Sequence, residues 1–162
     1  APAVADYLAH LAQKLYGVGV AVALVGVGEV VADVFESGGS EQRVYVADRK
    51  NGRVQVFDQD GNFIVEWKQF GKPSSVFVSK DDTIYVGAAF RDKGANKLDE
   101  LRGITVGNVK DGKLQAFIPD PSDLNQVEWG TSASGIAADD QGSIFAADVG
   151  THGLRKYVKV SK

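Results

Sequence analysis

The stretch Arg43-Val44-Tyr45-Val46-Ala47-Asp48-Arg49-Lys50-Asn51-Gly52-Arg53-Val54-Gln55-Val56-Phe57-Asp58 decides which fold we expect. Two runs of β-branched and aromatic residues flank a polar segment that ends in Asn51-Gly52. An Asn-Gly pair between such runs is a strong hairpin signal. Both runs are apolar on two faces, which is typical of strands packed between layers. A second turn at 58–61 leads into another apolar run at 62–67, so the sequence predicts three meandering antiparallel strands.

The composition is that of one soluble globular domain. The chain has 162 residues, a net charge of -3, 24% charged residues and 44% hydrophobic residues. The negative charge argues against attraction to nucleic acid or to an anionic membrane. The absence of cysteine excludes disulfides, thiolate metal sites and a cysteine nucleophile. Because the chain also has no methionine, we expect it to be a processed form or a piece of a longer protein.

The first 42 residues divide into two segments. Residues 1–16 are predicted to form an amphipathic helix, because apolar residues from Val4 to Leu15 recur at spacings of three and four. Residues 17–42 are predicted to form Val/Gly-rich strands, at about 18–25 and 29–35, and a polar turn. The apolar run before Glu29 has about 14 residues, too few to span a membrane. An alternative for this run is the core of an uncleaved signal sequence.

Residues 43–162 contain a repeated motif. Val44-Tyr45-Val46-Ala47 recurs as Ile84-Tyr85-Val86-Gly87 and as Ile144-Phe145-Ala146-Ala147. The first spacing matches one propeller blade, and the second matches a blade with insertions at about 89–100 and 119–131. The sequence therefore predicts an all-β fold of about three four-stranded β-propeller blades, at roughly 29–68, 72–118 and 132–160.

Three blades are fewer than the four to eight of a closed propeller. Three arrangements follow: two chains form one six-bladed ring as a homodimer, the chain is part of a longer propeller, or residues are missing near 17–42. The third predicted blade also lacks an outer fourth strand. The run at 18–25 is a candidate to supply it by pairing with the C-terminal strands.

The stretch at 43–57 resembles an NHL repeat. It is most similar to the version in peptidyl-α-hydroxyglycine α-amidating lyases and their bacterial secreted relatives. The likeness covers about residues 43–160, including Phe70-Gly71-Lys72-Pro73-Ser74 and Ala147-Asp148-Val149-Gly150. The resemblance implies a six-bladed β-propeller and a secreted or periplasmic location. It also implies cleavage of a peptidyl-α-hydroxyglycine to a peptide amide and glyoxylate at a zinc site on the axis.

The resemblance implies a catalytic role for Arg49, which stands where the lyases have a catalytic arginine. A guanidinium is a permanently charged fork that suits a substrate carboxylate. The family's last zinc histidine falls at Ser134, and the chain's only histidines are His10 and His152. Inherited zinc chemistry is therefore not expected. A zinc or calcium site stays open through four carboxylates, and we assign no metal ligands: Asp33, Asp48, Glu128 and Asp148.

In a propeller blade, loops that enter the first strand open on the same face as loops that join the second and third strands. The loops at 49–51, 72–74, 90–93, 119–134 and 150–152 should therefore share one mouth. Binding residues concentrate on loops held by a rigid scaffold. We predict four ligand-binding residues there: Arg49, Arg91, Ser134 and His152.

Three functions compete at this stage. The first is an NHL-repeat scaffold whose mouth binds a small molecule, a peptide or a protein partner. The second is an amidating-lyase-like, metal-dependent enzyme that uses Arg49 at an anionic substrate. The third, an RNA-binding NHL domain, is disfavoured by the negative net charge, because such surfaces are basic. We expect neither nucleic acid nor a membrane as a partner.

Overall fold

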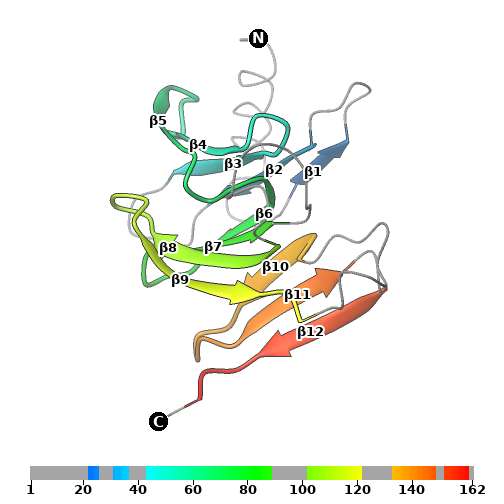
Figure 1. Cartoon of the computed structure of the whole chain (residues 1–162). Helices are drawn as coiled ribbons and strands as arrows, with labels where there is room; N and C mark the ends of the chain where they lie inside the picture. The colour runs from blue at the N-terminus through cyan, green and yellow to red at the C-terminus, as the bar shows by residue number, and fades with distance from the viewer. Residues whose placement is uncertain are drawn as a thin grey trace.

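A computed structural model describes residues 22–25, 31–36, 43–88, 102–121, 133–148 and 152–160, the first two ranges by their backbone alone. Every regular element within these residues is a β-strand (Figure 1). The helix predicted at 1–16 lies outside the described residues. Within the described part of the chain, no helix is long and apolar enough to cross a membrane.

The strands form three antiparallel sheets. The first contains β1 (Val22–Val25), β2 (Val31–Glu36), β3 (Val44–Asp48), β4 (Arg53–Phe57) and β5 (Phe63–Trp67) in sequence order. The second contains β6 (Pro73–Val78), β7 (Thr83–Ala88), β8 (Gly103–Asn108) and β9 (Leu114–Pro119). The third contains β10 (Gly135–Ala138), β11 (Ile144–Asp148) and β12 (Gly153–Tyr157). We call β2–β5 blade 1, β6–β9 blade 2 and β10–β12 blade 3, and the predicted all-β architecture of propeller-type blades is confirmed.

The hairpin at the centre of the prediction is present. β3 pairs with β4 from Val44↔Phe57 to Asp48↔Arg53. Gly52 adopts a φ of 62°, a left-handed conformation that glycine tolerates at no steric cost, and its N–H donates to the carbonyl of Arg49 at 3.2 Å. The next turn contains Gly61 at a φ of 84° and joins β4 to β5, as predicted.

The expectation that the run at 18–25 supplies an outer strand to blade 3 is wrong. β1 pairs instead with β2, from Val22↔Val34 to Val25↔Val31. The two strands are close in sequence, so their pairing closes a short loop, whereas pairing with β12 would close a loop of most of the chain. Among the described residues, blade 3 therefore has three strands.

Two apolar clusters hold the blades together, and the sheets follow one another in the order of the chain (Figure 1). Tyr45 and Trp67 of blade 1 pack with Ile84 and Val86 of blade 2. Tyr85 on the other face of β7 belongs to the second cluster, which also contains residues of blade 3: Ile136, Ile144 and Ala146. Because β7 contributes to both clusters, blade 2 is buried on two faces, as expected for an internal blade.

Candidate functional site

The strand register brings the strand ends that border the predicted mouth loops to one end of each sheet, which we call the loop end. In blade 1 this end carries Asp48, paired with Arg53, and the turn between them. In blade 3 it carries Asp148, paired with Gly153. In blade 2 four strand ends meet through successive register pairs: Pro73, Ala88, Gly103 and Pro119.

Buried hydrogen bonds join the loop ends of blades 2 and 3. Ser75 Oγ donates to the carbonyl of Ala133 at 2.6 Å, and Ser74 Oγ lies 3.1 Å from the same oxygen. Ser74 Oγ is also 2.9 Å from the carbonyl of Gly87 on β7. Ala133 has a φ of 55°, which is uncommon for a residue with a side chain. The entry to blade 3 is thus fixed tightly against the first two strands of blade 2.

Four charged residues continue this junction, and we call them the charge chain: Arg102, Asp120, Arg155 and Asp148. Asp120, which follows β9, forms ion pairs with Arg102 Nε and with Arg155 Nη1, the latter at 2.6 Å. Arg155 on β12 also places Nη2 3.5 Å from Asp148 Oδ2. Both carboxylates are almost fully buried. The charge chain links blades 2 and 3 through ion pairs. Its two cations and two anions sum to zero, so it carries no net charge to attract an ionic ligand.

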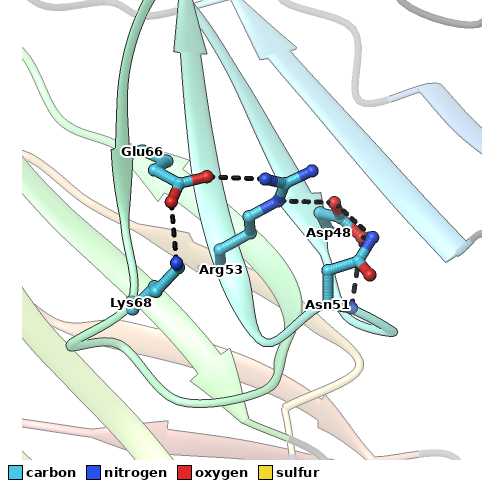
Figure 2. A network of polar contacts seen from close by, with 5 residues as sticks. All are labelled: Asp48, Asn51, Arg53, Glu66 and Lys68. Atoms are coloured by element: carbon cyan, nitrogen blue, oxygen red, sulfur yellow. Dashed lines mark hydrogen bonds and ion pairs between the residues drawn. The ribbon is translucent and has the colours of Figure 1, made fainter. Parts of the chain in front are cut away.

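A second polar network supports the loop end of blade 1 (Figure 2). Asn51 Nδ2 donates to both oxygens of Asp48 at 2.9 Å, and Arg53 Nε donates to Asp48 Oδ2 at 2.8 Å. Arg53 Nη1 forms an ion pair with Glu66 on β5 at 2.5 Å, and Lys68 Nζ forms an ion pair with the same carboxylate at 2.9 Å. These bonds raise the pKa of Arg53 and lower that of Glu66, since hydrogen bonding to a charged form favours it. The network fixes the turn at 49–52 to the outer strand of the blade.

Arg49 is the first residue of that turn. Its side chain is half-buried, and burial lowers the pKa of its guanidinium, because lost hydration disfavours the charged form. An arginine stays ionised at neutral pH even so. The turn therefore holds a permanent positive charge in a partly dehydrated position at the loop end.

The other predicted site residues have different positions. Ser134 and His152 both lie at the loop end of blade 3, since the Ser134 N–H donates to Ala147 at 2.8 Å and His152 directly precedes β12. His152 is exposed and has a φ of 52°. Blade 2 separates this pair from Arg49. Arg91 lies outside the described residues.

The structure describes the side chains of two of the four carboxylates considered for metal binding, Asp48 and Asp148. Among the described residues, no group of three histidine or acidic side chains could hold a metal ion. Asp48 and Asp148 lie in different blades, and each forms an ion pair with an arginine of its own blade. Asp33 is described by its backbone alone and Glu128 is outside the described residues, so we derive no chemistry through a metal.

The sequence alone did not point to the charge chain. Arg102 and Asp120 border the two insertions, and nothing in their spacing relates them to Arg155. A signal is visible only in hindsight, since Asp148 and Asp48 occupy the same place after the repeated motif and each holds an arginine from the following strand.

Comparison with known families agrees with this geometry at blade 1. Residues 37–57 match the NHL repeat, a match that includes β3, β4 and the turn that carries Arg49. No curated protein matched the chain. The chain therefore contains one stretch that matches the NHL repeat, within a propeller-type β-sheet scaffold.

Proposed function

We propose that the chain is a propeller-type binding scaffold whose loop end holds the carboxylate of a small molecule or a peptide, with Arg49 as the residue that contacts it. The observation that carries the proposal is the position of Arg49, whose half-buried side chain lies on the ordered turn between Asp48 and Arg53 at the loop end of blade 1. The guanidinium is a permanently charged fork of donors, and a carboxylate accepts such a fork in bidentate geometry.

The rigidity of the turn supports binding over a purely structural role. Asp48 and Asn51 hold the turn from within, and the Gly52 N–H closes it onto the Arg49 carbonyl. A residue on an ordered turn loses little conformational freedom when it binds a ligand. Ser134 and His152 would add polar contacts from blade 3 for a ligand long enough to cross blade 2.

N-acetylglycine and its amide are suitable probes, because they differ only in the carboxylate. We expect N-acetylglycine to cause saturable NMR shifts at the amides of Arg49, Asn51 and Gly52, and the amide probe to cause none. Arg49→Gln should weaken binding about tenfold or more, because a hydrogen bond to a charged group contributes about 1.5–3 kcal/mol. Lys113→Gln removes the same charge at the opposite end of blade 2 and should leave the affinity unchanged. Equal binding of the two probes would refute the proposal.

The lyase-like alternative assigns Arg49 to an anionic substrate. It needs a metal or another group to activate the hydroxyl of a peptidyl-α-hydroxyglycine, and Asp48 and Asp148 are already held by arginines. We therefore favour binding without turnover. Release of glyoxylate from N-acetyl-α-hydroxyglycine, with zinc or calcium supplied and with loss of activity in Arg49→Gln, would replace the binding function by the enzymatic one.

A further inference from the structure

Asn51 and Gly52 carry two groups that can react with each other. The backbone nitrogen of the residue after an asparagine can attack the side-chain amide, and a glycine in that place leaves the attack unhindered because it has no side chain. Asn51 is the only asparagine of the sequence that is followed by glycine, and it is exposed. Water is the only co-reactant, so an exposed turn can undergo the whole reaction.

Both reacting groups are held in hydrogen bonds, and Figure 2 shows those of Asn51. Its Nδ2 donates to both oxygens of Asp48 at 2.9 Å, and its backbone N–H donates to Oδ1 of the same carboxylate at 3.4 Å. The Gly52 N–H donates to the carbonyl of Arg49 at 3.2 Å. Attack requires the amide to leave Asp48 and the Gly52 nitrogen to give up its proton, so these bonds must open first.

We propose that Asn51 is a deamidation site whose reaction opens the turn at 49–52, and that Asp48 keeps this reaction slow in the folded chain. The Gly52 nitrogen forms a bond to Cγ of Asn51 and gives up its proton. The Cγ–Nδ2 bond breaks, and Nδ2 leaves as ammonia with that proton. Water then opens the cyclic imide at either carbonyl, which gives aspartate or isoaspartate. No oxidant or reductant takes part, and the net change replaces an amide by a carboxylate.

The product places a second carboxylate where Asp48 now receives hydrogen bonds. The Asp48 side chain is 9% exposed, and its ion-pair partner Arg53 is shared with Glu66. Two carboxylates at hydrogen-bond distance repel each other, and burial strengthens the repulsion. The turn should therefore open, and Arg49 at its start should lose its fixed position. The added negative charge, two residues from Arg49, also opposes an anionic ligand.

Mass spectrometry of the whole chain, incubated at mildly alkaline pH, tests the chemistry. The peptide that contains Asn51 should gain the difference in mass between water and ammonia, and part of the product should be a substrate for isoaspartyl methyltransferase. Asp48→Ala should speed this change about tenfold or more, because hydrogen bonds to a charged group no longer hold the amide. Asp48→Asn, which keeps an acceptor, should give an intermediate rate.

The other turn of blade 1 supplies the controls. Asp58 holds Asn62 through the same two kinds of hydrogen bond, at 2.8 and 2.9 Å, but Asn62 is followed by Phe63. Asn62 should therefore stay unmodified in every variant. Asp58→Ala should leave the rate at Asn51 unchanged, and melting curves identify any variant that reacts because it has unfolded.

Asn51→Asp tests the consequence directly, with Asn51→Gln as the neutral control. Hydrogen exchange at the Gly52 amide should be faster in Asn51→Asp than in Asn51→Gln. Asn51→Asp should also bind N-acetylglycine about fivefold more weakly, because one negative charge is added near the site. This last expectation rests on the proposed function, so a failure of the unmodified chain to bind N-acetylglycine would count against that function alone.

Three results would overturn the inference. The first is no change at Asn51 in either the unmodified chain or Asp48→Ala. The second is an equal rate in these two proteins, since Asp48 would then give no protection. The third is equal exchange at Gly52 in Asn51→Asp and Asn51→Gln, since the added carboxylate would then leave the turn closed.

Discussion

Arg155 of blade 3 donates from Nη1 to Oδ1 of Asp120 in blade 2 across 2.6 Å, and the Asp120 side chain is only 1% exposed. Arg102 approaches the other oxygen of the same carboxylate. The junction at the loop end is therefore held by a buried ion pair in addition to the apolar cluster.

We expect Asp120→Ala to lower the free energy of unfolding by about 3–5 kcal/mol, because it removes the carboxylate paired with the buried Arg102 and leaves Arg155 with Asp148 alone. Urea denaturation measures the loss. The chain offers a matched control in Lys80 and Asp140, which also join blades 2 and 3 but are 78% and 82% exposed. Asp140→Ala should cost less than about 1 kcal/mol. Similar losses in the two variants would show that the buried pair contributes no more than a surface pair.

Gly87 should not tolerate a side chain. A Cβ at this position would lie 2.2 Å from the Ala133 carbonyl oxygen and 2.5 Å from Ser75 Oγ, so the hydrogen-bonded junction would have to open. We expect Gly87→Ala to destabilise the protein by about 3 kcal/mol in urea denaturation. Gly135→Ala is the control, because the nearest atom to its Cβ is Ala147 Cβ at 3.6 Å, an ordinary contact. Its stability should change by less than about 1 kcal/mol.

Much of the fold was predictable because blades repeat. The Asn51-Gly52 signal located a real hairpin, and the positions of Tyr45, Tyr85 and Phe145 identified the second strand of each blade. The pairing of β1 was not predictable with the same success, since a Val/Gly-rich run carries no marker of its partner strand. The pattern of apolar residues indicates that a strand exists. Which strand it pairs with depends on loop lengths, and the apolar pattern does not encode these.

Blade topology predicted which strand ends the candidate site residues border, while the site itself stays a prediction. Blade topology alone placed Arg49, Ser134 and His152 at loop ends, where the register has them. Their roles stay predictions. The ion pair between Asp120 and Arg155 was not predictable, because it joins residues whose proximity depends on how one blade is stacked on another.

The stability that the turn between β4 and β5 contributes should depend on pH. Asn62 donates to both oxygens of Asp58, at 2.8 and 2.9 Å, and these bonds lower the pKa of Asp58 below its ordinary value of 3.8. The bonded carboxylate therefore stabilises the fold above pH 3.8, and this stabilisation is lost as the pH falls through the lower folded pKa.

Asn62→Ala should raise the pKa of Asp58 toward 3.8 in an NMR titration. The stability difference between this variant and the unmodified chain should shrink at acidic pH. Asp139, whose pKa is lowered chiefly by the backbone N–H of Ser143 in blade 3, serves as an internal reference and should not move. An unchanged pKa at Asp58 would mean that the Asn62 side chain does not cause the shift.

Asp48 should control the order of the turn that carries Arg49. Its carboxylate holds Asn51 and Arg53 together, and the Gly52 N–H bond to the Arg49 carbonyl depends on that arrangement. Asp48→Ala should cost about 1.5–3 kcal/mol in stability, since it removes charge-assisted hydrogen bonds. It should also speed hydrogen exchange at the Gly52 amide by more than global destabilisation explains.

Asp58→Ala is the control for that experiment, because it disrupts the other turn of blade 1 and should leave exchange at Gly52 unchanged apart from the global effect. Asp48→Asn separates charge from shape, since the amide keeps one acceptor for Asn51 but loses the ion pair with Arg53. We expect exchange at Gly52 to be intermediate in that variant. A change in stability without a change in exchange at Gly52 would contradict this prediction. Asp48 would then stabilise the pairing of the strands and not the turn, and the backbone of the hairpin alone would determine the position of Arg49.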